Sequence, residues 1–345
     1  MSHQPPQPRS MPATDRHISL AHGNGGGLMR ELIETVFAPA LQNPWLDTGA
    51  DAVGLPGGGG DELVVTTDGF TVKPLEFPGG DIGSLAVHGT VNDLAVAGAL
   101  PRYLTLSVFL EEGLEIELLR RLAASIGRAA RDCGVAIVAG DTKVVGRGEC
   151  DGVYLATTGI GFRRPDLKLG LAQIQTGDRV IVSGSIGEHG TAVMLARESF
   201  GLRGDLQSDA ASVLPVAQAL ATVLGLRFMR DPTRGGVATV AHEIARTTGY
   251  GIRFDESSIP VSDPVQSVCE LLGFDPLYLA CEGRVLAVVA ADAADAALQA
   301  MRPYAPGAAV IGQVVEGAPD VVLGTSFGGE RVLDELEDDP LPRIC

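Results

Sequence analysis

Aromatic residues, positive charge and long apolar runs are all scarce in this sequence. Aromatics make up 5% of the 345 residues, so the cores have to be built from Val, Leu, Ile and Ala. The formal net charge of −17 argues against a broad contact with the phosphate backbone of a nucleic acid. No apolar run reaches the roughly 18 residues of a membrane span, and no secretory signal precedes the first motif. We therefore expect a cytoplasmic protein that binds neither nucleic acid nor membranes.

Cysteine is also sparse, and none of the five cysteines forms a Cys-x-x-Cys pair or a Cys/His metal pattern. This spacing argues against a zinc site and against a disulfide framework. Cys133 and Cys269 fall in apolar helical patterns, where a small buried side chain is expected. Cys345 differs because it is the last residue and follows Pro340 and Pro342, which do not continue a helix. It is either an accident of the chain end or a chemical handle on a mobile tip.

The length favours two domains, each with its own core. Residues 1–17 are polar and Pro-rich, which predicts a disordered leader. Strands and helices alternate over an N-terminal domain at 18–165 and over a C-terminal domain at 166–333. Residues 334–345 form a flexible acidic tail that ends in Cys345. We predict an α/β (α+β) fold of two α/β domains with mixed sheets.

The apolar periodicity also predicts individual elements. Strands are expected over 62–72, 103–110, 135–140, 152–162, 179–184, 251–254, 284–290 and 308–315. Helices are expected over 83–100, 115–131, 189–199, 209–224, 236–248, 263–272 and 292–302.

Two early glycine clusters, at 22–27 and 56–60, are candidates for phosphate binding. The first precedes an apolar helical pattern, and backbone N–H groups ahead of a helix suit an anion. Neither cluster is a P-loop or a dinucleotide-binding fingerprint, so a plain flexible loop is the competing interpretation. Asp231 and Arg234 form a second turn ahead of a helix, again suited to an anion.

Acidic residues that interrupt apolar surroundings suggest a metal site. An isolated carboxylate there is costly unless it has a partner, and several that share a site need a hard cation such as Mg²⁺. The aspartates in question are Asp51, Asp68, Asp93 and Asp141. Four independently hydrogen-bonded loop aspartates are the alternative.

One polar stripe marks the helix expected over 83–100. Asp81, Ser84, His88 and Asn92 follow steps of three and four residues, so they share one helix face. This stripe either faces water or lines a nucleotide pocket. Glu282, beside a glycine at the mouth of an apolar strand, is on local pattern alone more typical of a turn than of a catalytic base.

Four motifs together resemble the HypE family of hydrogenase maturation factors. They are FPGGDIGSLAVHGTVNDLAVAGALPRYL at 77–104, VAGDTKVV at 138–145, RDPTRGG at 230–236 and the terminal PLPRIC. The resemblance covers His22 to Cys345, and the ending separates this family from its relatives. Those relatives are aminoimidazole ribonucleotide synthetase, selenophosphate synthetase and thiamine-monophosphate kinase.

The resemblance implies an ATP- and Mg²⁺-dependent enzyme that forms a homodimer through its N-terminal sheet. Members receive a carbamoyl group on the terminal cysteine from the carbamoyltransferase HypF and dehydrate it to a thiocyanate. The cyanide then passes to iron on a HypC–HypD complex, for the active site of nickel–iron hydrogenase. We therefore expect an ATP-dependent carbamoyl dehydratase that acts on its own C-terminal cysteine.

The resemblance also implies roles for individual residues. The metal positions match Asp51, Asp68, Asp93 and Asp141. The cofactor-binding positions match His22, Gly23, Gly25, Gly26, Asp68, Asn92, Asp93, Asp141 and Thr142, to which the turn adds Asp231 and Arg234. The catalytic positions match Cys345, Glu282 and Lys143. The chain departs from the family at Asn24 and Gly69, where Ser is frequent, and at Cys281, where Asn is frequent.

Two other functions compete with this one. A small-molecule kinase or a selenophosphate synthetase of the same superfamily is disfavoured, because the glycine loop has no reactive cysteine and neither accounts for the tail. A non-enzymatic scaffold, switched by nucleotide and docking a maturation partner through its acidic tail, is the alternative from a different class.

Overall fold

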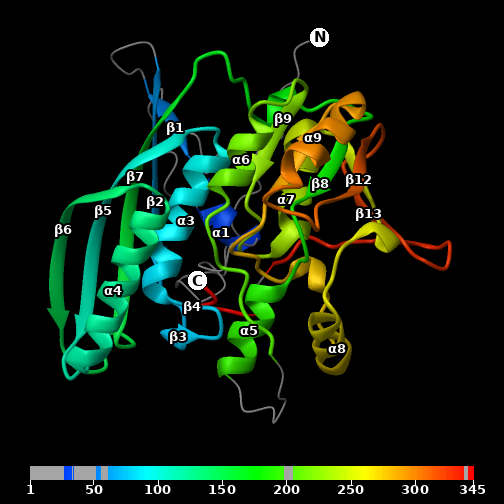
Figure 1. The fold of residues 1–345 in the computed structure, drawn as a ribbon. Coiled ribbons are helices and arrows are strands. Elements are labelled where there is room, and N and C mark those ends of the chain that lie inside the picture. Colours follow the sequence, from blue (N-terminus) through cyan, green and yellow to red (C-terminus); the bar gives the residue numbers. More distant parts are fainter. Residues whose placement is uncertain (1–26, 33, 35–51, 56–60, 198–204, 338–340) are drawn as a thin grey trace.

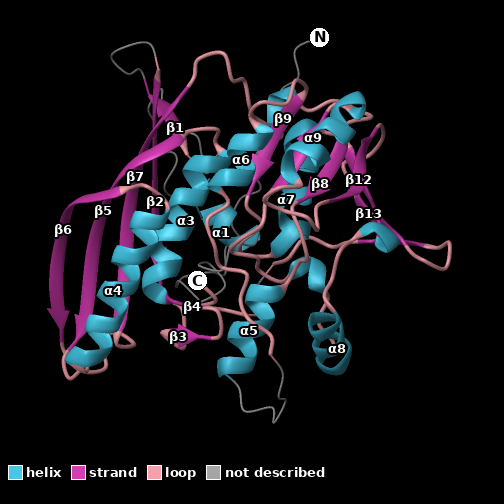
Figure 2. Cartoon of the chain, in the orientation of Figure 1, coloured by secondary structure: helices cyan, strands magenta, loops and turns pink. Residues whose placement is uncertain are grey.

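The structure is a computed structural model that describes residues 27–32, 34, 52–55, 61–197, 205–337 and 341–345 (Figure 1). The predicted leader, the glycine loop from His22 to Gly26, and Asp51 lie outside the described residues. Two sheets with their helices form two α/β halves, and the C-terminus lies between them (Figures 1 and 2). No helix of the described part is long and apolar enough to cross a membrane.

The N-terminal sheet has five strands in the order β1-β2-β7-β5-β6. Only β5 and β6 pair in parallel, so the sheet is mixed as predicted. The strands are β1 (Val53–Leu55), β2 (Glu62–Phe70), β5 (Leu100–Glu111), β6 (Ala136–Val145) and β7 (Val153–Arg163). The helices of this half are α1 (Gly27–Leu32), α3 (Ile82–Val96) and α4 (Ile116–Asp132), and a small hairpin joins β3 (Glu76–Phe77) to β4 (Gly80–Asp81).

Helix α3 is buried on nearly every side because it lies between the N-terminal sheet and the C-terminal half. Such a helix is apolar all round rather than amphipathic. Its start is fixed by Asp81, which accepts hydrogen bonds from the N–H groups of Gly83 and Ser84 at 2.8 and 2.9 Å. Two members of the predicted polar stripe, Asp81 and Ser84, therefore form a capping box instead of lining a pocket.

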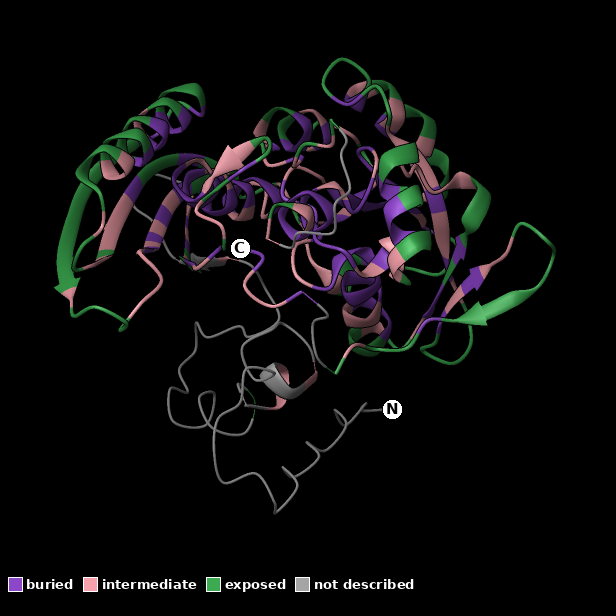
Figure 3. Cartoon of the chain, turned by 90° about the horizontal axis from the view of Figure 1, so that it is seen from below, coloured by how far each residue is buried: buried purple, intermediate pink, exposed green. Residues whose placement is uncertain are grey.

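Helices α3 and α4 cover one face of the N-terminal sheet, and no described helix covers the other face (Figures 2 and 3). Helix α4 is amphipathic and buries only one side, with Leu122, Ile126 and Ala129 against the core. The uncovered face exposes Tyr103 and Phe109 of β5, at 45% and 39% of their surface.

The C-terminal sheet has seven strands in the order β14-β13-β10-β12-β8-β11-β9. They are β8 (Arg179–Val182), β9 (Leu226–Arg230), β10 (Gly251–Asp255), β11 (Leu286–Val289), β12 (Ala309–Val315), β13 (Val321–Gly324) and β14 (Glu330–Val332). The helices are α5 (Glu188–Arg197), α6 (Leu214–Leu220), α7 (Gly236–Thr248), α8 (Asp263–Leu272) and α9 (Ala294–Met301). Strand β11 is buried on both faces because separate apolar clusters pack on its two sides.

The predicted elements are largely confirmed, with three differences. The helix expected over 209–224 spans only Leu214–Leu220, because the N–H groups of Ala211 and Val213 donate to Glu282 and Asn92 instead of to carbonyls within a helix. Strand β6 continues to Val145, so Asp141 and Lys143 lie on a strand, not in a loop. Strands β1, β3, β4, β9, β13 and β14 were not predicted, since short strands give little periodic signal.

The end of the chain is anchored at two places. Before the undescribed residues 338–340, the carbonyl of Leu336 accepts a hydrogen bond from the N–H of Gly27 at 3.0 Å, and Glu335 forms an ion pair with Arg246 at 3.1 Å. After them, Ile344 and Cys345 are 2% and 8% exposed within an apolar cluster to which both halves contribute. The structure therefore shows the tail tip inside the protein, and its predicted flexibility stays a prediction.

Candidate active site

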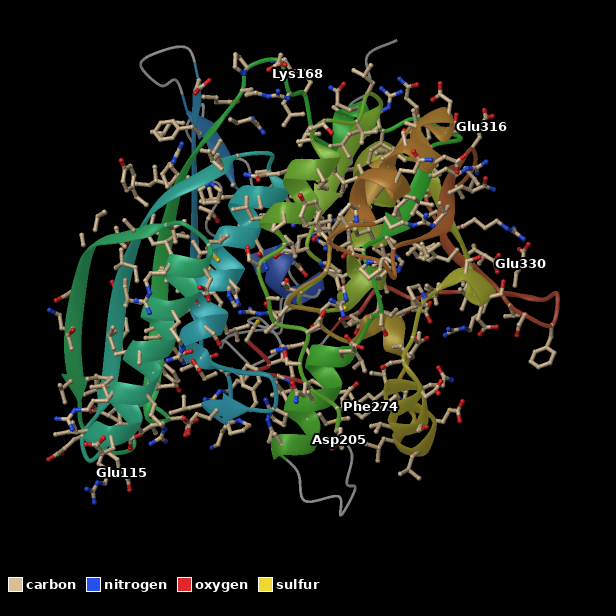
Figure 4. The ribbon with its side chains drawn as sticks, viewed as in Figure 1. Glu115, Lys168, Asp205, Phe274, Glu316 and Glu330 are labelled. Atoms are coloured by element: carbon tan, nitrogen blue, oxygen red, sulfur yellow. The ribbon has the colours of Figure 1, made fainter. Side chains whose placement is uncertain are left out.

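Cys345 lies between the two halves with its sulfur against an arginine. The Nε group of Arg234 donates a hydrogen bond to the Cys345 Sγ atom at 3.1 Å. Burial raises the pKa of the Cys345 thiol to about 12, although the charge of Arg234 acts in the opposite direction. The docked cysteine is therefore a neutral thiol at physiological pH. Side chains such as Glu115, Lys168 and Glu330 lie at the periphery of the molecule (Figure 4).

Three carboxyl groups belong to this site. Asp68 from β2 and Glu282 from the segment before β11 shift the pKa values of Cys345 and Arg234, and Asp231 from the turn before α7 is close enough to raise the pKa of Glu282. Glu282 is 2% exposed, and its Oε1 atom is buried without a hydrogen-bond partner. We call Cys345, Arg234, Asp68, Asp231 and Glu282 the junction cluster.

The junction cluster raises the pKa values of its own carboxyl groups. Burial, followed by the charges of Asp231 and Asp68, raises the pKa of Glu282 well above its usual value. Burial also raises the pKa of Asp231 to about 6, and the pKa of Asp68 is raised by burial against the opposing charge of Arg234. Arg234 is the basic group of the junction cluster, and its charge lowers the pKa values of Cys345, Asp68 and Glu282 against the larger effect of burial. Carboxyl groups tuned toward neutral pH in a closed site are typical of acid–base chemistry.

The RDPTRGG segment folds into a turn that places Asp231 and Arg234. The N–H of Thr233 donates to the Asp231 carbonyl at 3.0 Å, and the Cys281 N–H donates to the Pro232 carbonyl at 3.0 Å, which ties the turn to the Glu282 segment. Gly236 has a φ of 59°, and a Cβ atom there would lie 2.6 Å from the Leu277 and Leu279 carbonyls. Glycine is therefore required for α7 to begin this close to the acid-bearing segment.

Asn92 and Asp93 support the site from α3. The Asn92 amide donates to the carbonyls of Ala211 and Glu282 at 3.0 and 3.2 Å, and its oxygen accepts the Val213 N–H at 2.8 Å. Asn92 thus connects α3 to the backbone of the C-terminal half, and both the nitrogen and the oxygen of its side-chain amide are hydrogen-bonded. Asp93 accepts a hydrogen bond from Thr66 at 2.7 Å. The predicted contacts of both residues with ATP stay predictions.

The predicted residues on β6 do not join the junction cluster within one chain. Asp68 on β2 pairs with Thr157 on β7, and Thr157 pairs with Leu106 on β5. Paired residues lie on the same face of a sheet, so Asp68 lies on the face that α3 covers. Asp141 on β6 pairs with Ser107, the residue after Leu106 on β5. Successive side chains of a strand point to opposite faces, so Asp141 lies on the uncovered face. The Asp141 side chain is 61% exposed and pairs with Lys143 at 2.9 Å, which lowers the pKa of Asp141. Thr142 lies between them on the same exposed edge strand.

Cys281 is turned away from its neighbour Glu282. Its sulfur accepts a hydrogen bond from the Gly187 N–H at 3.2 Å, and the side chain packs in the core of the C-terminal half. Burial is the largest cause of its raised pKa. Cys281 is therefore part of the C-terminal core, and the departure from the family expected at this position stays a prediction.

The donor set at the junction suits Mg²⁺ better than a softer metal. Among the residues that the structure describes, no three potential ligands are already gathered into a cage. Mg²⁺ keeps several waters and usually takes one or two carboxylates together with substrate phosphates, so a preformed cage is not required. Asp68 and Asp231, whose negative charges oppose each other's ionisation, fit such a partial shell.

Comparison with known proteins decides the family. Models described as "AIR synthase related protein" match at residues 49–162 for the N-terminal domain and 175–324 for the C-terminal domain. The chain is 47% identical over 334 residues to carbamoyl dehydratase HypE of Azotobacter vinelandii, covering 95% of this chain and 97% of that protein. The chain belongs to the carbamoyl dehydratase HypE family.

Solved HypE structures agree with this assignment. The HypE chain of a HypE–HypF complex aligns with a TM-score of 0.83 at 43% identity, covering 88% of this chain and 99% of that one. A HypE structure in complex with ATP aligns with a TM-score of 0.80 at 43% identity, covering 94% and 99%. The predicted family and fold class are thus confirmed.

Several residues around the tail were not predicted from the sequence. Thr71, His189 and Arg197 contact the last residues of the chain, and Asp209 contacts the backbone of Glu282 at 3.1 Å. His189 falls within an apolar helix pattern, where a buried structural histidine is the ordinary expectation. The apolar helix pattern around His189 predicts that its side chain is buried. It does not predict that the side chain contacts the last residues of the chain.

Proposed function

We propose that this chain is an ATP-dependent carbamoyl dehydratase that acts on its own C-terminal cysteine. It converts an S-carboxamide on Cys345 to an S-cyanide, which supplies the cyanide ligands of the nickel–iron hydrogenase iron centre. The observation that carries the proposal is the junction cluster: the terminal thiol lies at Arg234, in a closed site with Glu282, whose buried oxygen has no partner.

Dehydration removes the carbonyl oxygen and two N–H protons from the carbamoyl group. When bound, ATP supplies the phosphoryl group that makes this oxygen a phosphate leaving group, and Mg²⁺ neutralises the phosphate charge. Glu282 would take an N–H proton, and its raised pKa makes its carboxylate a stronger base than an ordinary glutamate. Arg234 holds the sulfur, while burial keeps out the water that would hydrolyse an activated carbon. Asp68 and Asp231 would hold Mg²⁺.

The remaining predicted ligands belong to this proposal as well. The glycine loop, with His22, Gly23, Gly25 and Gly26, would bind the phosphates together with Asn92, Asp93 and Thr142. Asp51 and Asp141 would complete the metal site, and Lys143 would place or relay charge near the sulfur. Support for ATP comes from the ATP complex of the aligned HypE structure.

Loading and delivery require the tail to leave the docked position. Cys345 is 8% exposed, so a carbamoyltransferase has no access to its sulfur here. We infer that the tail swings out to HypF for loading, docks for dehydration, and swings out again to the HypC–HypD complex. The HypE–HypF complex among the aligned structures supports the first partner.

A homodimer through the N-terminal sheet accounts for its uncovered face. Exposed apolar side chains on one side of a sheet mark an interaction surface, and Tyr103, Phe109 and Phe162 are all at least 36% exposed there. A second copy packed on this face would also cover Asp141 and Lys143. In a homodimer, Asp141 and Lys143 of one copy would lie near the other copy and could contribute to a site formed by both chains. In a single chain they lie on the face away from the junction cluster.

Mass spectrometry of the C-terminal peptide tests the function. After incubation with a carbamoyl donor, HypF and ATP, the Cys345 peptide should gain a carbamoyl group and then lose the mass of one water molecule. Cys345→Ala should bind ATP but carry neither modification. A scaffold switched by nucleotide, or a small-molecule kinase, would leave the mass of the wild-type peptide unchanged and would refute the proposal.

A further inference from the structure

The last four residues are held mainly through their backbone carbonyl groups. Arg197 donates from Nη1 to the Pro342 carbonyl at 2.7 Å and from Nη2 to the Arg343 carbonyl at 2.6 Å. The Nε2 atom of His189 lies 2.8 Å from the Ile344 carbonyl. Each of these three successive carbonyls therefore has a side-chain donor from α5.

The N-terminal half holds the same segment from the other side. The N–H and Oγ1 groups of Thr71 donate to the main-chain oxygen of Cys345, the last residue, at 3.1 and 3.3 Å. The Lys73 N–H donates to the Arg343 carbonyl at 3.4 Å, and the Lys73 carbonyl accepts from Arg197 Nε at 3.0 Å. Arg197 thus joins the tail and the segment after β2 through one guanidinium group.

His189 has its tautomer fixed by a chain of donors. A carbonyl only accepts, so the Nε2 atom of His189 must carry the proton that it donates to Ile344. Its Nδ1 atom then accepts from the Ser208 hydroxyl at 2.7 Å, and the Ser208 oxygen in turn accepts the Ala210 N–H at 3.0 Å. Burial lowers the pKa of His189 to about 4, so the neutral ring is present at physiological pH.

Arg343 shows that the tail conformation is imposed by its surroundings. It has a φ of 60°, the only positive value of a non-glycine residue in the described part of the chain. Such a conformation costs free energy and persists only where contacts over-determine it. The Arg343 guanidinium forms an ion pair with Asp151, donates to the Thr71 carbonyl at 3.2 Å, and lies 5.7 Å from the centre of the Tyr154 ring.

We propose that Thr71, His189 and Arg197 form a peptide-binding cradle for the last four residues of this chain, which positions the Cys345 sulfur beside Arg234. The cradle recognises three kinds of feature: backbone carbonyls, the Arg343 guanidinium and the buried Ile344 side chain. Its three members are positioning residues, since their described contacts are to the carbonyls and not to the sulfur. The effect of the cradle on the rate of dehydration rests on the proposed function. The binding of the tail by the cradle does not.

Thiol alkylation of the full chain measures docking without any chemistry at the site. Cys150 is partly exposed and serves as an internal reference, so the rates of Cys345 and Cys150 peptides are compared in one sample by mass spectrometry. We expect Arg197→Met to raise the Cys345/Cys150 ratio by about tenfold or more, as expected for the loss of charge-assisted hydrogen bonds. The matched control is Arg253→Met, which removes an ion pair with Glu330 away from the tail and should leave the ratio unchanged.

His189 gives a second variant with its own rescue. His189→Leu removes the donor to Ile344 and should raise the ratio, whereas His189→Gln offers an amide N–H in place of Nε2 and should restore much of the protection. A packing role alone would not separate Gln from Leu in this direction. Unchanged ratios in both Arg197→Met and His189→Leu, or an equal rise in Arg253→Met, would overturn the cradle.

The consequence for reaction is measured on protein already carbamoylated at Cys345. In the double variant Arg197→Met/His189→Leu, the single-turnover rate of water loss should fall about tenfold or more at unchanged ATP affinity. A wild-type rate in that variant would refute the positioning role. If wild-type protein itself never loses water, the proposed function fails while the alkylation result still decides whether the cradle binds the tail.

Discussion

Glu282 and Asp141 look alike in the sequence, since each is an acidic residue beside a glycine at an apolar strand, yet they lie in opposite environments. Glu282 is 2% exposed, faces other carboxyl groups, and has a raised pKa. Asp141 is exposed, is paired with Lys143, and has a lowered pKa. The strand of Glu282 lies inside a seven-stranded sheet, whereas the strand of Asp141 is the edge of a sheet with one uncovered face. The role of a carboxylate is thus decided by what packs over its strand.

Removing the Glu282 charge should give the largest effect. In Glu282→Gln the proton acceptor is lost, so dehydration of carbamoylated protein should slow by about 100-fold or more and the carbamoylated form should accumulate. The mass of the C-terminal peptide, followed over time with ATP, measures this. The exposed control Glu330→Gln should dehydrate at the wild-type rate, and an equally fast Glu282→Gln variant would remove Glu282 from the mechanism.

Placing a charge on the uncovered face should break the proposed dimer. Phe109→Glu puts a carboxylate where an apolar interface is expected, so sedimentation should show a shift from dimer to monomer at micromolar concentration. Leu224→Glu is the matched control, because Leu224 is 93% exposed in the C-terminal half. Dissociation by the control alone, or a monomeric wild type, would contradict the assignment of this face.

Asp231 tests whether burial raises the pKa values of the carboxyl groups in the junction cluster. Its folded-state pKa of about 6 lies above the ordinary 3.8, so the folded chain binds this proton more tightly than the unfolded chain. The free energy of unfolding therefore falls as the pH rises from about 4 to 6, and the loss persists at higher pH. Asp231→Asn should flatten this dependence and raise the free energy of unfolding at pH 7 by on the order of 1–3 kcal/mol.

Urea unfolding at several pH values measures this effect. Asp166→Asn, at an exposed side chain, is the control and should reproduce the wild-type curve. A pH dependence of Asp231→Asn equal to that of the wild type would mean that Asp231 is not strained by its burial.

Asp141 should give the smallest effect. Asp141→Asn removes one partner of an exposed ion pair, which stabilises a single chain little, so the urea midpoint of monomeric Phe109→Glu protein should not move. A clear change in that background would show that Asp141 is engaged within one chain. If Asp141→Asn instead lowers ATP affinity only where the dimer forms, the second copy brings Asp141 to the site.

The sequence predicted the elements with strong periodicity almost to their ends. Helices α7 and α8 were predicted at their observed bounds, because glycines in the left-handed region at Gly249 and Gly273 end them sharply. The helix expected from residue 209 was wrong in its first turns, since the N–H groups of Ser208 and Val213 donate to Pro78 and Asn92 and the backbone between them is not helical. These hydrogen-bond partners lie more than 100 positions away in the chain, so a local pattern of apolar residues does not reveal them.

By itself, the sequence determined the family and the two-domain α/β architecture, because four motifs and the apolar periodicity are local properties. Only the tertiary structure decided that Cys345 docks at Arg234, that Glu282 meets Asp231 and Asp68, and that Thr71, His189 and Arg197 hold the tail. The physical reason is that burial and charge at a junction depend on groups from both domains and the chain end. Their meeting is a consequence of packing, and no spacing along the chain encodes it.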